Sequence, residues 1–363
     1  MTAAGSGGTS ANAGGSAATA STASASTAAG QASWTVRTLL AWVTGFLKER
    51  EVDSPRAIAE ILLADTLGVE RMRLYMEPDR EPSADELARF RALVARAGRH
   101  EPVQFLVGRW PFLGRDFEVA PCTLIPRPCT EALVEHALAW CRSLPEERRA
   151  GGLRALDLCT GTGCIAVSVA LGMRAVLRPS DAGCRPLGGA AGAAASALPV
   201  VQIGEAAGAA TGEHAAAAPH TMVATDLVPE AVALAQRNAA RLGAAIDFRT
   251  GDLWSALRGD ETFDLVLSNP PYVTDDEYAA LDRNVRDYEP ASALRGGRDG
   301  LDFVRRLAAE AERRTRPGGL VLVEIGWKHR DPAMALFAGR AWRSVEVARD
   351  GEGLDRVLVA HRA

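Results

Sequence analysis

The chain has 363 residues, of which 47% are hydrophobic and 24% charged, and its formal net charge is −4. This composition is typical of a soluble globular protein, and the length is enough for two domains. The negative charge argues against non-specific attraction to nucleic-acid phosphates, and the apolar runs are too short to span a membrane. The six cysteines form no C-x-x-C pair, which predicts reduced thiols in a cytosolic protein without zinc or disulfides.

The first segment, 1–33, consists almost entirely of Ala, Ser, Thr and Gly, with no charge and no aromatic ring. Such a segment cannot bury enough surface to offset its ordering entropy, so we expect a disordered tail. It has no basic start and no arginine, which argues against a signal or transit peptide and favours a cytoplasmic protein.

The next segment, 34–109, has a helical pattern and is predicted to form a small domain. Ser83 and Glu86 have the spacing of a capping box at the start of a helix with an apolar stripe. Residues 37–118 carry 13 Lys and Arg against 14 Asp and Glu, so this region is no basic clamp. Residues 110–126 are predicted to form a β-hairpin linker to the second domain.

From Leu153 onward, strand and helix patterns alternate. The predicted strands are LRALDL, MVATD, AIDFR, FDLVLSN, GLVLVEI and DRVLVA, and helical patterns such as PEAVALAQRNAARLG lie between them. This alternation predicts an α/β domain over 127–363, with a mostly parallel sheet covered on both faces. Gly163 and Asp226 are 63 positions apart, where about 20 are expected, so 177–221 is predicted to be a disordered insertion.

Glycine and acidic residues follow three of these strands. In LDLCTGTGC, Gly161 and Gly163 allow a ligand to approach the backbone and the free N–H groups of the next helix. Asp226 ends the second strand, where an acid can accept both ribose hydroxyls, and Asp252 follows the third, where it could face an adenine amino group. Because the turn is not G-x-G-x-x-G, the three together favour S-adenosylmethionine over NAD.

SNPPY, Ser268 to Tyr272, ends the fourth strand at the same sheet edge. The Asn269 side chain and the Pro270 carbonyl are two acceptors that could hold both hydrogens of a planar –NH2 group. Pro271 removes a competing donor, and Tyr272 could cover the flat face of the group. Such a nitrogen is a poor nucleophile, so catalysis must come from alignment, which can contribute about 7–11 kcal/mol. The acceptor pair would suit adenine N6, cytosine N4, guanine N2 or a glutamine amide, so the motif predicts amino methylation and leaves the substrate open.

A family resemblance narrows the substrate. It covers about 50–175 and 222–362 and is carried by AEILLADTLGVERMRLYMEPDRE, EPVQFLVGRWPFLGRDFEV, LIPRPCTEALVE, SNPPYV, VRDYEPASALRGGRDGLDFVRRL, LVLVEIG and DRVLVA. These segments resemble the HemK/PrmC-type protein-(glutamine-N5) methyltransferases. The resemblance implies a Rossmann-like class I S-adenosylmethionine-dependent methyltransferase with a seven-stranded sheet. It also implies an N-terminal helical domain that docks a peptide chain release factor and methylation of the glutamine in its Gly-Gly-Gln motif.

The resemblance also assigns the candidate site residues. Those for the cofactor are Asp157, Cys159, Thr160, Gly161, Thr162, Gly163, Asp226, Asp252, Leu253 and Asn269. Those for the glutamine substrate are Arg127, Asn269, Pro270, Pro271 and Tyr272, with Asn269, Pro270 and Tyr272 as the catalytic group. No metal is expected.

The chain departs from the family pattern at several positions. Cys159 replaces the usual first glycine of the turn, which is compatible with cofactor binding if its φ is negative, and we interpret it as a packing residue. Cys129 replaces an acid in the Pro-Arg-Pro loop, while Glu131 is kept. Trp254 stands one place after the position where some relatives have tryptophan beside the adenine.

Three other functions stay open at this point. The same reaction on ribosomal protein L3 is one alternative, because the enzymes that perform it often have a cysteine at the first turn position. Amino methylation of a nucleic acid is less compatible with the near-neutral helical domain, because nucleic-acid interfaces are strongly positive. A binding module without catalysis would not need both Asp226 and an intact SNPPY.

Overall fold

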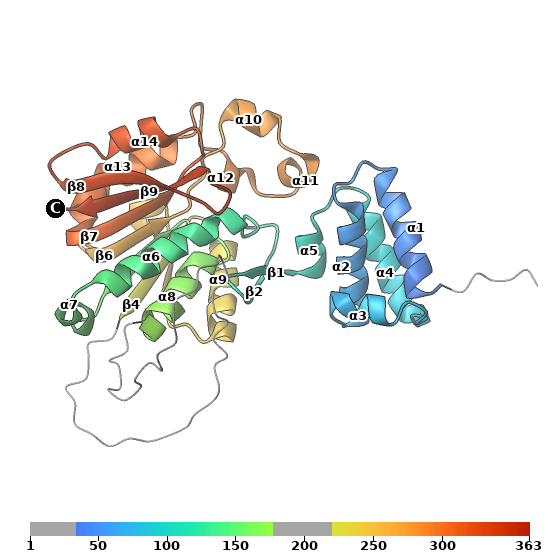
Figure 1. The fold of residues 1–363 in the computed structure, drawn as a ribbon. Helices are drawn as coiled ribbons and strands as arrows, with labels where there is room; N and C mark the ends of the chain where they lie inside the picture. The colour runs from blue at the N-terminus through green and yellow to red at the C-terminus, as the bar shows by residue number, and fades with distance from the viewer. Residues whose placement is uncertain (1–33, 177–219) are drawn as a thin grey trace, which may run out of the picture.

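The computed structural model describes residues 34–176 and 220–363, and within these ranges a helical bundle and an α/β domain are joined by a hairpin (Figure 1). The predictions for the 1–33 tail and for most of the insertion lie outside the described residues. Residues 220 and 221 are described, and Thr221 begins a strand, so the boundary of the insertion predicted at 221 is wrong.

The N-terminal bundle has its own apolar core. Its helices are α1 (Val36–Lys48), α2 (Pro55–Leu67), α3 (Arg71–Met76), α4 (Ala84–Ala97) and α5 (Val103–Val107). The predicted capping box of α4 is confirmed: the Glu86 N–H donates to Ser83 Oγ at 3.3 Å, and the Ser83 N–H donates to Glu86 Oε2 at 2.7 Å. Phe90, Val94 and Ala97 of α4 are buried in a core that also contains Leu39, Leu62 and Leu63, among others.

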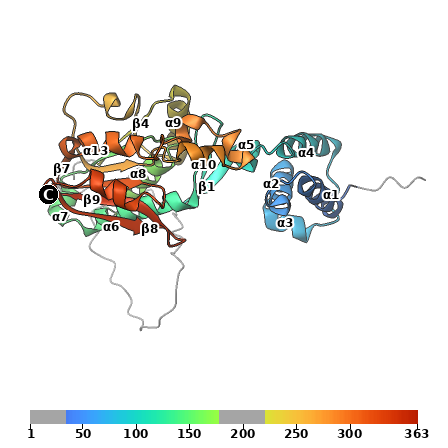
Figure 2. The same cartoon turned by 90° about the horizontal axis from the view of Figure 1, so that it is seen from above.

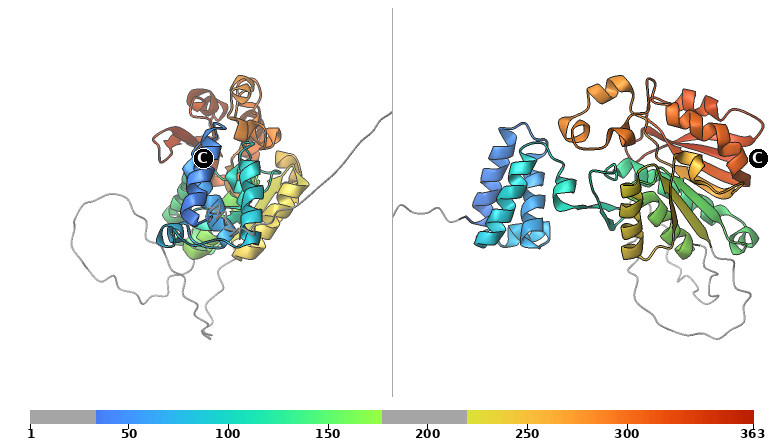
Figure 3. Two further views of the ribbon diagram at one scale, coloured as in Figure 1. Left: turned by 90° about the vertical axis from the view of Figure 1, so that its right-hand side faces the viewer. Right: turned by 180° about the vertical axis from the view of Figure 1, so that it is seen from behind.

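The hairpin follows directly after α5. Its antiparallel strands are β1 (Arg109–Phe112) and β2 (Arg115–Glu118), which confirms the predicted hairpin. Phe112 and Phe117 are buried against the α/β domain, which anchors the hairpin to that domain. Figures 2 and 3 show the hairpin and α5 between the bundle and the α/β domain.

The predicted mostly parallel sheet is confirmed. In the described part of the chain, its strands follow the order β5-β4-β3-β6-β7-β9-β8, and only β9 is antiparallel to its neighbours. They are β3 (Arg154–Leu158), β4 (Thr221–Asp226), β5 (Asp247–Thr250), β6 (Phe263–Ser268), β7 (Thr315–Glu324), β8 (Trp342–Arg349) and β9 (Asp355–Arg362). The order reverses between β3 and β6, so the loops that leave these strands diverge and open a crevice at their carboxyl ends.

Helices cover both faces of the sheet, because its central strands are apolar on both sides. One face packs against α6 (Glu131–Ser143), α8 (Cys164–Val176) and α9 (Pro229–Leu242). The other packs against α13 (Asp302–Arg314), α14 (Arg330–Leu336) and the short helix η2 (Leu253–Ala256). The remaining short helices are η1 (Pro128–Thr130), α7 (Glu146–Ala150), α10 (Asp275–Ala279), α11 (Arg283–Arg286) and α12 (Ala291–Leu294).

Strand β8 is the element that the sequence patterns missed. It lies at the edge of the sheet, and most of its side chains are partly or fully exposed. An edge strand with little apolar surface has a weak hydrophobic pattern, so pairing with β9 rather than its own sequence defines it.

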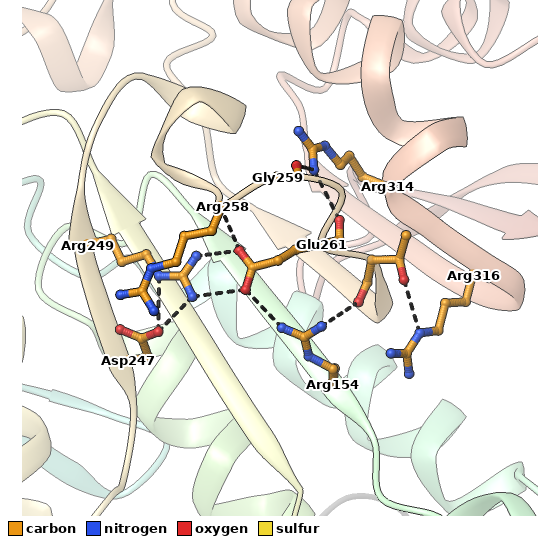
Figure 4. A network of polar contacts seen from close by, with 9 residues as sticks. Arg154, Asp247, Arg249, Arg258, Gly259, Glu261, Arg314 and Arg316 are labelled. Atoms are coloured by element: carbon orange, nitrogen blue, oxygen red, sulfur yellow. Dashed lines mark hydrogen bonds and ion pairs between the residues drawn. The ribbon is translucent and has the colours of Figure 1, made fainter.

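A network of arginines and carboxylates closes the amino-terminal edge of the sheet, opposite the crevice (Figure 4). Glu261 accepts from Arg249 Nη1 at 2.6 Å, from Arg154 Nη2 at 3.1 Å and from the Arg258 N–H at 2.8 Å. These donors lower the pKa of the Glu261 carboxyl to about 2, with the Arg249 hydrogen bonds as the largest cause. The network ties the starts of β3 and β5 to the loop before β6.

Candidate functional site

A cavity of about 580 Å³ lies at the carboxyl ends of β3, β4 and β6. Its lining includes most of the predicted site residues, namely Arg127, Cys159, Thr160, Gly161, Thr162, Asp226, Asp252, Leu253, Asn269 and Pro271. Leu158 of β3 pairs with Ser268 of β6, so the glycine turn and SNPPY leave neighbouring strands side by side. The four predicted residues outside this lining are Asp157, Gly163, Pro270 and Tyr272.

The glycine turn is held from its side by β4. The Thr160 N–H donates to the Thr225 carbonyl at 2.9 Å, and the Gly161 N–H donates to Asp226 Oδ2 at 2.8 Å. At Gly163, with φ of +80°, a Cβ atom would lie 3.0 Å from the Cβ of Ala235 on α9. Gly163 therefore allows α8 and α9 to pack closely.

Asp157 is fully buried beneath the turn. Its Oδ2 accepts from the Thr160 hydroxyl at 2.6 Å, while Oδ1 has no hydrogen-bond partner among the described residues. Burial raises the pKa of this carboxyl to about 7, against the opposing effect of the Thr160 hydrogen bond. The structure thus places Asp157 as a support for the turn.

Cys159 has a φ of +62°, so the expectation of a negative φ at this position is wrong. The left-handed region costs an L-residue about 1–2 kcal/mol, and glycine avoids this cost. The thiol packs against an apolar cluster, and burial raises its pKa above the ordinary value. A protonated, packed thiol agrees with the interpretation of Cys159 as a packing residue.

Asp226 ends β4 and lines the cavity. Besides the Gly161 N–H, it accepts from the Val228 N–H at 3.0 Å, so both oxygens are oriented by the backbone. Burial raises its pKa, and these backbone hydrogen bonds oppose the rise. The next residue, Leu227, is 58% exposed and lines the same cavity, which gives a flat apolar wall that the sequence patterns had not identified.

Asp252 and Leu253 lie on the far wall of the cavity. The Asp252 carboxylate is half exposed and pairs with Arg306 Nη2 at 2.7 Å. Trp254 is buried in the apolar core on the side of α13, with its indole N–H donating to the Arg306 carbonyl at 3.1 Å. It does not line the cavity, so any ring contact with a ligand there would have to come from elsewhere.

In SNPPY, the Asn269 amide is held by a residue distant in sequence. Its Nδ2 donates to Thr130 Oγ1 at 3.2 Å, and no described residue donates to its Oδ1. Pro271 lines the cavity, and Pro270 is buried behind it. The Tyr272 hydroxyl donates to Glu324 Oε1 at 3.1 Å, which fixes the ring beside the acceptor loop.

Arg127 lines the mouth of the cavity and forms an ion pair with Glu289. Glu289 is only 4% exposed, and its other oxygen accepts from the Ile125 N–H at 3.0 Å. The neighbouring Tyr288 hydroxyl donates to the Arg99 carbonyl of the helical bundle at 2.7 Å. The segment after SNPPY therefore contacts both the Pro-Arg-Pro loop and the bundle.

Three residues of this site were not singled out from the sequence: Thr130, Glu289 and Glu324. Each lies in a segment that carries the family resemblance, and each is a buried polar residue at a loop or at a strand end. A buried carboxylate in an apolar strand, as in LVLVEIG, is the one local signal that could have indicated a role.

A parallel sheet with this strand order, a glycine turn after β3, an acid after β4 and SNPPY after β6 defines a class I S-adenosylmethionine-dependent methyltransferase. The cavity volume lies within the range of cofactor sites, and the backbone-oriented Asp226 suits the two hydroxyls of a ribose. The chain's own residues therefore fit this cofactor.

The comparisons with known proteins identify the family. The model of the PrmC N-terminal domain matches residues 38–108, and that of a methyltransferase domain matches residues 200–288. The release factor glutamine methyltransferase of Geobacter sulfurreducens is 37% identical over 326 residues, covering 90% of this chain and 96% of that protein. The enzyme of the same name from Bacillus subtilis is 32% identical, covering 90% and 97%. The chain belongs to the release factor glutamine methyltransferase family.

A solved methyltransferase from Pyrococcus furiosus is a more distant likeness. It is 18% identical, with a TM-score of 0.39, and the match covers 77% of this chain and 98% of that one. The family assignment rests on the sequence relatives.

Proposed function

We propose that this protein transfers a methyl group from S-adenosylmethionine to the side-chain amide nitrogen (N5) of the glutamine in the Gly-Gly-Gln motif of peptide chain release factors. The relatives named release factor glutamine methyltransferase cover nearly the whole chain and support this substrate. The observation that carries the proposal is the Asn269 amide, whose nitrogen is held by Thr130 and whose oxygen has no protein donor among the described residues.

This arrangement suits an amide substrate. The lone pair of an amide nitrogen is delocalised, so an ordinary base cannot activate it, and alignment with the methyl donor must supply the rate. Asn269 Oδ1 and the Pro270 carbonyl accept the two N–H hydrogens and orient the nitrogen, while Tyr272 covers the amide plane. The nitrogen forms a bond to the methyl carbon as the carbon–sulfur bond breaks, and one amide proton leaves to solvent. The cofactor supplies an electrophilic methyl group on a sulfonium.

The remaining candidate residues divide between the two ligands. We assign the turn Cys159–Gly163 and Asp226 to the methionine and ribose parts of the cofactor, and Leu227, Asp252 and Leu253 to the adenine. Arg127, held by Glu289, belongs to the substrate side of the cavity. Asp157 and Gly163 act through the shape of the turn.

The domain division supports a protein substrate. We assign 34–109 to release-factor docking, 110–126 to the linker and 127–363 to catalysis. The bundle is connected to the cavity through the Tyr288–Arg99 hydrogen bond and the Arg127–Glu289 ion pair, so a partner held by the bundle would lie near the mouth of the cavity. Among the helices of the described ranges, none is long and apolar enough to cross a membrane. We place the protein in the cytoplasm and expect no direct binding of nucleic acid.

A methyl-transfer assay with labelled S-adenosylmethionine tests the function. It compares a release factor, the same factor with its loop glutamine changed to alanine, ribosomal protein L3 and DNA. We expect label only on the intact release factor; label on L3 or DNA alone would refute the substrate.

The variant Asn269→Ala tests the site. We expect it to lose transfer while its cofactor affinity, measured by calorimetry, stays within about twofold of the wild type, because the two contacts are separate. Asn284→Ala, in the loop after SNPPY, is the matched control and should retain transfer. Full transfer by Asn269→Ala would refute the acceptor role.

A further inference from the structure

Glu324, the last residue of β7, is a fully buried carboxylate beside the acceptor loop. Its Oε1 accepts from the Tyr272 hydroxyl at 3.1 Å and lies 3.8 Å from Cys129 Sγ, while Oε2 has no hydrogen-bond partner among the described residues. A buried carboxylate with an unpaired oxygen is costly, so its presence next to a reactive site calls for a reason.

The surrounding hydrogen bonds form a directed chain. A threonine hydroxyl has one hydrogen to donate and two lone pairs that accept. Thr130 Oγ1 accepts from Asn269 Nδ2, so its own hydrogen is free for another acceptor. Thr130, Tyr272 and Cys129 are the side chains whose hydrogen bonds oppose the rise that burial causes in the pKa of Glu324. The carboxylate is therefore the acceptor toward which the hydroxyl hydrogens of Thr130 and Tyr272 point.

We propose that Glu324 is a positioning residue for methyl transfer: by drawing the hydrogens of Thr130 and Tyr272, it orients the Asn269 amide, so that the oxygen and not the nitrogen faces the substrate –NH2 group. This inference rests on the proposed function and adds the residue that sets the acceptor geometry. If Thr130 instead donated toward Asn269, the amide would have to turn over, and its NH2 group would face the substrate with donors where acceptors are needed.

The charges around Glu324 support a single, undivided carboxylate. Arg356 is the nearby cation and lowers the pKa of Glu324, although it is itself paired with Asp350 at 2.9 Å. Cys129 stands where the resembling enzymes have an acid, and burial raises the pKa of its thiol to about 11, so it stays neutral. Two acids at this spacing would share a proton, whereas here Glu324 has no carboxylate neighbour within the acceptor loop.

Nitrogen NMR of the asparagine side chains tests the orientation directly, without any substrate. The chain contains four asparagines, 12, 238, 269 and 284, so selective ¹⁵N labelling gives four amide pairs, and Asn269→Ala assigns the one of interest. In the wild type with cofactor bound, we expect the Asn269 –NH2 to be shifted and slow to exchange, as a hydrogen-bonded amide is. Glu324→Gln and Thr130→Ala should each abolish this protection, and Thr130→Ser should restore it.

The same variants give the kinetic test. Because a misplacement of about 1 Å can cost about 100-fold in rate, we expect Glu324→Gln to lower kcat about 100-fold. Its cofactor Kd should stay within about twofold of the wild type. Asp264→Asn is the matched control: Asp264 is also a buried acid, at the other end of β6, and its loss should reduce stability without this fall in kcat.

The two tests separate the possible failures. An unchanged Asn269 resonance in Glu324→Gln and Thr130→Ala would overturn the inference, even if the wild type methylates release factors as proposed. An equal fall in kcat for Asp264→Asn would show a general effect of stability and would also overturn it. If the wild type methylates none of the offered substrates, the proposed function fails, and the NMR measurement still decides the inference.

Discussion

The positive φ of Cys159 leads to a prediction about the glycine turn. Hydrogen bonds from the next two backbone N–H groups to Thr225 and Asp226 hold the turn, so the residue at 159 cannot relax to a negative φ. Cys159→Gly and Cys159→Ala both remove the thiol, and they differ only in the Cβ atom. The comparison of the two therefore isolates the backbone strain.

The magnitude follows from two opposing effects. The left-handed conformation costs alanine about 1–2 kcal/mol relative to glycine. Glycine, in turn, loses about 0.4–1 kcal/mol through the greater freedom of its unfolded chain. Together they predict that the unfolding free energy of Cys159→Gly exceeds that of Cys159→Ala by about 1 kcal/mol, which is a Tm difference of about 2–4 °C for a domain of this size.

Urea unfolding monitored by circular dichroism, at one pH and without cofactor, measures the difference. The control is Ala170→Gly, in the helix α8 that follows the turn, where glycine should reduce stability by about 1 kcal/mol. If Cys159→Gly proves less stable than Cys159→Ala, the turn is not strained at this position, and the reasoning is refuted.

Three further predictions concern the buried acids and the insertion. Burial raises the pKa of Asp157 from 3.8 to about 7, so the folded state binds the extra proton between these values, and wild-type stability should fall by about 1.4 kcal/mol per unit as pH rises from about 4 to 7. Asp157→Asn should lack this fall in pH-dependent urea unfolding. Glu261→Gln should cost about 1–2 kcal/mol at pH 7, since the Arg249 hydrogen bonds lower the pKa of this partly exposed acid to about 2, and the difference should vanish as pH falls toward 2. Replacing 177–219 with a short Gly/Ser linker should leave methyl transfer largely unchanged, because the flanking β3–β4 pairing is complete without it.

Each of these predictions has a contrary outcome. Parallel pH curves for Asp157→Asn and the wild type would mean that Asp157 is ionised when folded. A Glu261→Gln difference that persists at pH 2 would assign its effect to packing. A large loss of transfer in the shortened chain would assign a function to the insertion.

The sequence alone determined the strands β3, β4, β5, β6, β7 and β9, the hairpin, the capped helix α4 and the order of the glycine turn, Asp226 and SNPPY. These features are encoded within short segments, by hydrophobic runs, capping residues and proline or glycine at strand ends. Because parallel strands end at the same edge of the sheet, their order was also enough to place most candidate residues around one cavity.

Tertiary structure alone decided how the polar groups of the site are paired. Asn269 meets Thr130 across 139 positions, Arg127 meets Glu289 across 162, and Cys129 lies beside Glu324 across 195. It also forced Cys159 into a positive φ, through hydrogen bonds to β4, and defined β8 by pairing at the sheet edge. Local periodicity carries no information about such partners, because a hydrogen bond depends on the positions of two atoms that only the packed sheet brings together.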